Sequence, residues 1–323
     1  MTDSDSSPLS RRQWLERFSG PALAVTVGAG LLSAPLGAQP PPSAPGPSRN
    51  LASPGARVYD VREFGAKGDG ATIDTVAVQT AIDTCNREGG GTVLVPAGDF
   101  VIGTVDLRSH VTLHLAARGR LLGSPRKEDY RPGAGIPKNN GNVVLLGAAE
   151  IENVLIEGTG MIDGNGAKFW TGQGDNTGPG QNAAQGYFER PHLIVFSHCK
   201  NVRMRDVFLT ASAYHCTRIL DCENVWFDGL RIFNRVNKNN DGFHFNNCRY
   251  VHVTGCDVKC QDDACALFGS NQWVTVSDCT FSTRWSIFRF GGGEAGEHHD
   301  HELRDLRHLR LGDQNGGARG QPL

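Results

Sequence analysis

Three aspartates, Asp241, Asp262 and Asp263, are the residues of this chain best suited to acid–base chemistry. They stand among β-forming and turn residues, where a carboxylate is costly unless it is solvated, paired or used. Clustered carboxylates cannot all ionise cheaply, so the pKa of one is raised and that group stays protonated as an acid. The alternative interpretation is that they are polar turn residues that bind Ca²⁺.

A repeat in the sequence explains how these aspartates meet. Asp262 follows Asp241 by 21 residues, which is about one turn of a parallel β-helix. Five segments share apolar alternation and begin at Ile151, Cys199, Cys222, Cys248 and Asn271. The start at Cys222 lies 23 residues after Cys199, and the start at Cys248 lies 26 residues after Cys222. Alternating strands at this period predict an all-β fold, a right-handed parallel β-helix (solenoid) whose stacked coils bury a common core.

The cysteines follow the same repeat. Cys199, Cys222 and Cys248 share one repeat position, and Cys256 and Cys279 share another. This pattern favours a ladder of small buried hydrophobic side chains, with metal binding or redox chemistry as the alternative.

A helix is predicted to cap the N-terminal end of the solenoid. Asp74 is a suitable N-cap, and the apolar residues that follow lie on one helical face: Val78, Ala81, Ile82 and Cys85. Three consecutive glycines, 89–91, end this helix. The glycines between Asp60 and Gly70 indicate a turn entering the helix, with a phosphate-binding loop as the alternative.

The first residues resemble an export signal. Ser10–Leu15 resembles the twin-arginine motif, and an apolar run from Pro21 to Ala38 follows. We therefore expect a signal peptide at 1–38, a disordered linker at 39–57, and export to the periplasm or beyond the cell. A membrane anchor or an ordinary helix is the alternative for the leader.

The tail breaks the repeat. The expected β-helical domain is 58–296, and residues 297–323 lack apolar alternation. His298, His299 and His301 could form a metal site, and a short amphipathic helix is possible at 303–311. We favour a third hypothesis, a frameshift, because reading one nucleotide later permits a further coil with the expected spacing. The C-terminal coils are then missing.

Composition excludes several classes of function. The net charge of −2 over 323 residues gives no field for polyanions, so nucleic acid is not an expected partner. The odd number of cysteines, 9, excludes a complete disulfide framework within one chain. We expect a monomer with no cofactor, no metal and no stable membrane insertion.

Several motifs together resemble the polygalacturonase family, glycoside hydrolase family 28. They are Ile162–Gly166, Arg190-Pro191, Asn239-x-Asp241-Gly242, Asp262-Asp263 and the Cys-x-Asn-Val repeats, within a likeness that runs from about 58 to 289. The resemblance implies inverting hydrolysis of pectic or related uronic-acid or rhamnose-containing polysaccharides. It also implies that Asp262 is the general acid and that Asp241 and Asp263 hold the attacking water as base.

The chain also departs from the family pattern. The family usually has Asp at the position of His244 and Gly-His-Gly where this chain has Thr283-Arg284-Trp285. No convincing counterpart of its downstream Arg-x-Lys is present. We expect Asn239 and His244 to bind substrate, as well as Arg284 and Arg289, whose cations suit an acidic sugar.

Two other functions remain open. The first is a polysaccharide lyase of the same architecture, with Arg284 or Lys259 as the base and Ca²⁺ held by the aspartates. The second is a catalytically impaired β-helix that only binds glycans.

Overall fold

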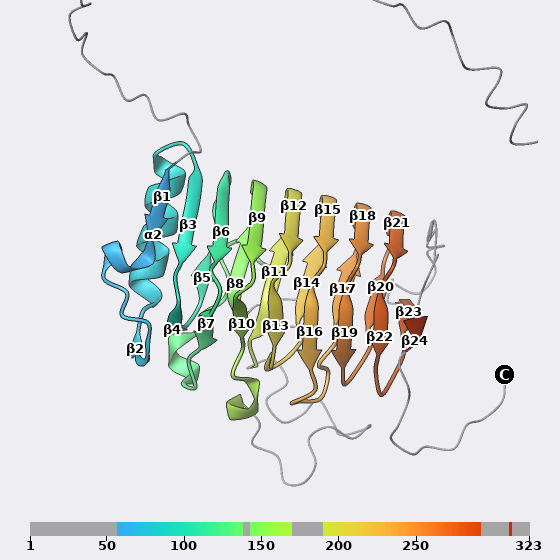
Figure 1. The fold of residues 1–323 in the computed structure, drawn as a ribbon. Helices are drawn as coiled ribbons and strands as arrows, with labels where there is room; N and C mark the ends of the chain where they lie inside the picture. The colour runs from blue at the N-terminus through green and yellow to red at the C-terminus, as the bar shows by residue number, and fades with distance from the viewer. Residues whose placement is uncertain (1–56, 138–142, 170–189, 292–309, 312–323) are drawn as a thin grey trace, which may run out of the picture. The chain divides into compact units, whose positions relative to one another are not determined.

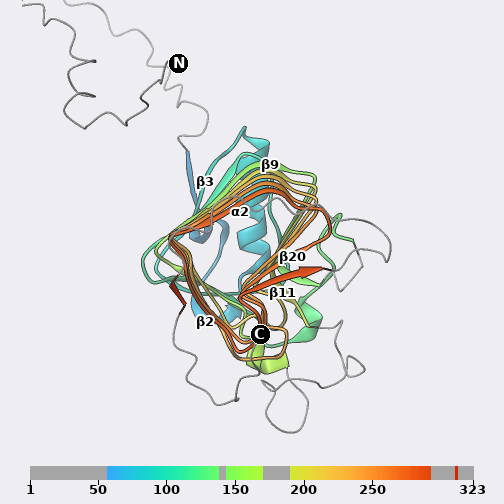
Figure 2. The ribbon, with the colours of Figure 1, turned by 90° about the vertical axis from the view of Figure 1, so that its right-hand side faces the viewer.

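The computed structural model describes residues 57–137, 143–169, 190–291 and 310–311. Their strands wind into a right-handed parallel β-helix with three sheets as its sides (Figure 1). Seen along its axis, the coils lie over one another and enclose a common interior (Figure 2). The predicted all-β solenoid is therefore confirmed.

Each full coil contributes one strand to each sheet. Sheet A contains β1 Val58–Asp60, β3 Gly91–Val95, β6 Val111–Leu115, β9 Glu152–Gly158, β12 Lys200–Arg205, β15 Glu223–Asp228, β18 Arg249–Thr254 and β21 Gln272–Ser277. Sheet B contains β2 Asp69–Ile73, β4 Gly98–Ile102, β7 Gly119–Gly123, β10 Met161–Asp163, β13 Phe208–Thr210, β16 Arg231–Asn234, β19 Asp257–Cys260, β22 Thr280–Ser282 and β24 Arg310–Leu311. Sheet C contains β5 Val105–Asp106, β8 Val144–Ala149, β11 His192–Ser197, β14 Thr217–Leu220, β17 Phe243–Asn246, β20 Cys265–Phe268 and β23 Phe288–Gly291.

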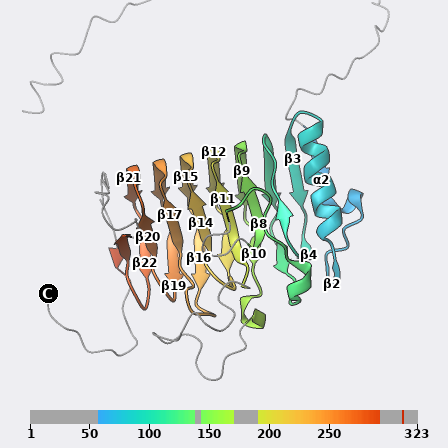
Figure 3. The same ribbon diagram turned by 180° about the vertical axis from the view of Figure 1, so that it is seen from behind.

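The described helices are one α-helix, α2 Thr75–Arg87, and three short 3₁₀ turns, η1 Val61–Phe64, η2 Lys127–Asp129 and η3 Gly166–Phe169. Helix α2 covers the end of the solenoid formed by the first coils (Figure 3). Its predicted apolar face, Val78, Ala81, Ile82 and Cys85, is fully buried. No helix in the described part is long and apolar enough to cross a bilayer.

The predicted role of Asp74 needs a correction. Asp74 does occupy the N-cap position of α2, but its side chain makes no hydrogen bond to the helix. Its carboxylate instead accepts hydrogen bonds from the backbone N–H groups of Lys67 and Gly68, at 2.7 and 2.9 Å. The nearby loop offers donors that reach the same oxygens, so Asp74 ties that loop to the start of the helix.

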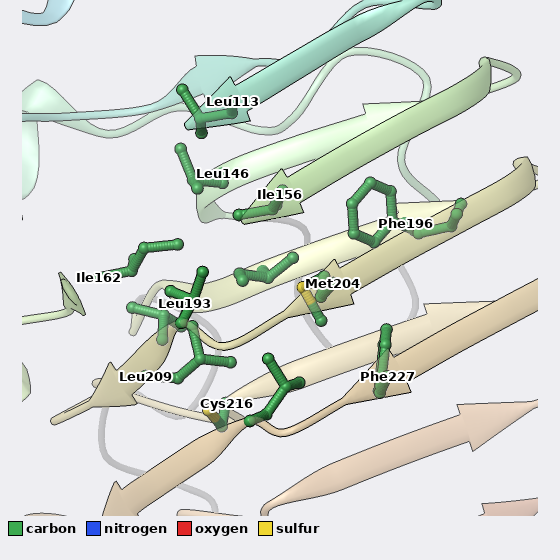
Figure 4. Close-up of a cluster of buried hydrophobic side chains, with 14 of the residues drawn as sticks. Leu113, Leu146, Ile156, Ile162, Leu193, Phe196, Met204, Leu209, Cys216 and Phe227 are labelled. Atoms are coloured by element: carbon green, nitrogen blue, oxygen red, sulfur yellow. The ribbon is translucent and has the colours of Figure 1, made fainter. Parts of the chain in front are cut away.

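Matched register fills the interior with rows of apolar side chains. Leu113, Ile156, Met204 and Phe227 occupy equivalent positions on successive strands of sheet A and are buried (Figure 4). Burial of each such side chain contributes about 1.5–3 kcal/mol relative to exposure. The cysteines at the two repeat positions stack in the same way, with Cys199 beside Cys222 and Cys256 beside Cys279, and all nine cysteines are free and buried.

Several expectations fall outside the described residues. These are the leader at 1–38, the linker up to residue 56 and most of the tail. Within the tail, residues 310–311 form β24, which pairs with β22, so the end of the helix considered there is a strand.

Candidate active site

The turns between sheets B and C bring the three aspartates together from two neighbouring coils. Phe243 pairs with Cys265 in sheet C, and the N–H of Gly242 donates to the carbonyl of Asp263 at 2.9 Å. This register places Asp241 beside Asp263, and Asp262 one residue before it. The aspartates therefore do lie on neighbouring coils, as the 21-residue spacing predicted. However, the residue in register with Asp241 is Asp263 rather than Asp262.

Burial differs among the three carboxylates. Asp241 and Asp263 are 5% and 3% exposed, whereas Asp262 is partly exposed. Burial, followed by the nearby charge of Asp263, raises the pKa of Asp241 well above its usual range. Burial and the charges of Asp241 and Asp263 raise the pKa of Asp262 to about 7. Asp262 is therefore the accessible carboxyl that can carry a proton near neutral pH.

Asn239 and Arg289, two of the predicted substrate-binding residues, contact these aspartates. The Asn239 amide donates to Oδ2 of Asp262 at 3.4 Å, and Arg289 forms an ion pair with Oδ2 of Asp263 at 3.1 Å. The other oxygen of Asp263, Oδ1, is buried and has no hydrogen-bond partner among the described residues. A buried acceptor of this kind points to a water or a ligand group at the site. Arg284 is exposed, and the cation seen against Asp263 belongs to Arg289.

His244 contacts a carboxylate, and a second histidine joins it. Nδ1 of His244 lies 3.1 Å from Oδ2 of Asp241, and Nε2 of His215 lies 3.7 Å from the same oxygen. The two rings stack, with centroids 4.7 Å apart and planes 14° apart. Burial, with a contribution from the Arg218 cation, lowers the pKa of His244 to about 3, and burial also lowers that of His215. Both imidazoles are therefore neutral; His244 is within hydrogen-bond distance of Asp241, whereas His215 at 3.7 Å is a close polar neighbour.

These three side chains also have the composition of a metal site. The donor atoms of His215, Asp241 and His244 lie within 4.8 Å of one another, and two imidazoles with a carboxylate can bind zinc. However, the two rings are stacked and nearly parallel, so one ion cannot lie in both ring planes unless a ring turns. The cations of Arg218 and Arg289 act against a second positive charge at His244. We therefore assign this cluster to the positioning of Asp241.

A buried polar network, which sequence reasoning did not find, supports the turn that carries Asp241. Oδ1 of Asn240 accepts from the N–H groups of Val236 and Asn237, at 3.0 and 2.7 Å. Its Nδ2 donates to the carbonyls of Ser212 and Tyr214, at 3.0 and 2.8 Å.

Two further residues extend this network to neighbouring backbone. Asn234 donates to the backbone carbonyl of Asp241 at 3.0 Å. Arg190 donates to the carbonyl of Lys238 at 2.8 Å and to Oδ1 of Asn239 at 3.1 Å. The four asparagines crowded into positions 234–240 were the available signal.

This arrangement of acids on a solenoid agrees with a comparison against known families. The model of the glycosyl hydrolases family 28 matches residues 85–288, which include all three aspartates. The chain belongs to this family. The resemblance inferred from the motifs is therefore confirmed at the level of the family.

Individual relatives of this family 28 protein are distant. An exo-poly-alpha-D-galacturonosidase of Dickeya chrysanthemi is 29% identical over 64% of this chain and 41% of its own length. A polygalacturonase of Chamaecyparis obtusa is 26% identical over 69% of this chain and 42% of its own. The chain thus spans less than half the length of these two curated relatives. An exopolygalacturonase structure from Thermotoga maritima shares the fold, with a TM-score of 0.60, 24% identity and coverage of 70% of this chain and 60% of its own.

Proposed function

We propose that this family 28 protein hydrolyses glycosidic bonds in a pectic or related acidic polysaccharide, by acid–base catalysis with inversion. One observation carries the proposal: a partly exposed carboxyl, Asp262, has its pKa raised to about 7 beside two buried carboxylates from adjacent turns. Asp262 would protonate the leaving oxygen. Inversion requires a second carboxylate that activates water on the other face of the sugar.

Asp263 and Asp241 supply that second function in different ways. Asp263 is paired with Arg289, and its Oδ1 lacks a partner among the described residues, so this oxygen can accept a proton from a water. Asp241 lies within hydrogen-bond distance of His244 and close to His215, and burial and the charge of Asp263 raise its pKa. We infer that Asp263 is the main base and that Asp241 orients the water.

The acidic substrate is argued from the cations and from the relatives. Only half of the Arg289 side chain is covered, so N–H groups remain for a sugar carboxylate in addition to Asp263. Arg284 adds a second exposed cation from the neighbouring turn. The two relatives compared above are named for action on galacturonan.

The test is the release of reducing ends from pectic and rhamnose-containing glycans by the full chain and by Asp262→Asn. Loss of a general acid lowers turnover by about 10²–10⁴-fold. Asp257→Asn is the matched control, because Asp257 is an exposed aspartate on β19 a few residues before Asp262, and we expect its turnover to be unchanged.

Three results would contradict this function. An unsaturated, ultraviolet-absorbing product would show elimination by a lyase. Retention of the anomeric configuration in the first product, followed by NMR, would exclude inversion. Binding of glycans without turnover by the unmodified chain would favour a protein that only binds glycans.

A further inference from the structure

A second concave site lies at the turns between sheets A and B. This groove has a volume of about 810 Å³ and lies at the opposite end of the sheet B strands from the aspartates. Strand β16 shows the relation: it begins at Arg231, which lines the groove, and ends at Asn234, which holds the backbone of Asp241. The groove is therefore separate from the candidate active site.

A row of outward-facing side chains in register forms one wall of this groove. Arg120, Met161, Phe208 and Arg231 occupy equivalent positions on β7, β10, β13 and β16. With a strand spacing of ~4.8 Å, the two arginines at the ends of the row are ~14 Å apart. The two residues between them are half-buried, and the Arg231 guanidinium lies over the Phe208 ring at 5.1 Å. The wall thus alternates a cation, an apolar surface and a cation.

The positive charges of the groove exceed the negative ones. Arg62 and Arg118 also line it, and both are exposed. Within the described ranges, no carboxylate lies at ion-pair distance from Arg62, Arg118 or Arg231.

The two acids of the groove lining already have partners. Asp69 accepts hydrogen bonds from the N–H groups of Ala71 and Thr72, which lower its pKa to about 2. Asp99 pairs with Arg120 at 3.0 Å. Asp69 stays ionised and offsets one of the three remaining arginine charges, so the groove keeps a net positive charge that favours an anionic ligand.

Glycines form the floor of the groove. Gly98, Gly119 and Gly160 start or precede three successive strands of sheet B, in register. A Cβ on Gly119 would lie 2.6 Å from the carbonyl oxygen of Val95, and one on Gly160 would lie 2.4 Å from that of Gly119. Glycine is therefore required for these tight turns, and no side chain rises from the floor.

We propose that this groove binds an anionic sugar chain as a second site, remote from the aspartates. The guanidinium groups of Arg118 and Arg231 would bind carboxylates, with the Arg–carboxylate geometry that favours paired hydrogen bonds. The apolar face of a sugar ring between them would pack on Phe208 and Met161. The choice of a uronate polymer as the anion rests on the proposed function, whereas the groove itself does not. Binding there would keep a polymer on the protein between cleavage events.

The test is isothermal titration of hexagalacturonate into the full chain carrying Asp262→Asn, so that the probe is not cleaved. Arg118→Gln with Arg231→Gln removes two cations of the groove. The matched control is Lys200→Gln with Arg249→Gln, which removes two exposed cations of sheet A. We expect the groove variant to lose one binding site per chain, or at least about tenfold in affinity for it, and the control to keep both.

Unchanged binding in the groove variant would overturn the proposal. Equal binding of a neutral hexasaccharide would overturn the anionic class, and full competition by inorganic phosphate at similar concentration would reduce the groove to a small-anion site. Hydrolysis of short oligosaccharides by Arg118→Gln with Arg231→Gln in the chain that keeps Asp262 separates the two proposals, because this variant should retain it. A chain that hydrolyses nothing but still loses a binding site in the groove variant would refute the proposed function alone.

Discussion

At the scale of residues, three identical side chains acquire different properties from their surroundings. Asp241 is buried against two neutral histidines, Asp263 is paired with a cation, and Asp262 is partly open to solvent. The chemistry therefore depends on the surroundings of each acid: a general acid must both keep its proton and be accessible to a substrate, and Asp262 meets both conditions.

The first prediction concerns pH. Catalysis requires protonated Asp262, whose pKa is about 7, so we expect kcat/KM to fall tenfold per pH unit above that value. The interacting acids titrate together, so the measured value belongs to the cluster. A rate that stays constant from pH 6 to pH 9 would contradict the assignment of Asp262 as the acid.

Stability gives an independent readout of the same group. The folded pKa of about 7 lies above the usual value of 3.8, so the folded state binds more protons between these limits. The stability that protonated Asp262 contributes to the folded state is fully present below about pH 4 and is lost as the pH rises through 7. Above pH 7, Asp262→Asn should therefore be more stable than the parent, by on the order of 2 kcal/mol after allowance for partial exposure. Thermal unfolding of both proteins at several pH values measures this.

At the scale of elements, the repeat allowed the strands to be predicted but not the support of the site. Apolar alternation and the cysteine positions follow directly from the stacking of coils, so they are visible in one sequence. The register of sheet C, which sets Asp241 against Asp263, depends on the length of each turn. His215 and Arg190 reach the site from earlier coils, through contacts that have no periodic signature.

Asn240 gives the prediction for the turn that carries Asp241. Asn240→Ala would remove four hydrogen bonds of the buried network, at a cost of about 2–4 kcal/mol. We expect turnover to fall as well, because Asp241 is the next residue. Urea unfolding and assays at low temperature, where the variant is folded, separate the two effects.

The control for this variant is Asn246→Ala at the end of β17. Asn246 has no side-chain role in the network, so we expect a change within about 0.5 kcal/mol and normal turnover. Equal losses in both variants would show that the effect of Asn240→Ala does not come from the buried network.

At the scale of the whole molecule, the same stacking both stabilises the fold and positions the site. Each coil packs mainly on its two neighbours, so stability is spread along the axis rather than concentrated in one centre. The active-site turns and the arginine-lined groove are at opposite ends of the same short strands of sheet B. A change in the packing of one coil should therefore be felt at the turns of that coil first.

Phe227 tests this coupling. Its ring is fully buried and lies 5.5 and 5.7 Å from the rings of Phe243 and Phe245 on β17, the strand that follows Asp241. Phe227→Ala should cost about 3–5 kcal/mol through the cavity it leaves. It should also lower turnover in the folded protein, because β17 loses the surface that fixes its position. The matched control is Phe233→Ala, since Phe233 is 47% exposed on β16 of the same coil, and we expect little change there. Normal turnover in folded Phe227→Ala would mean that the polar network alone positions Asp241, independently of the core.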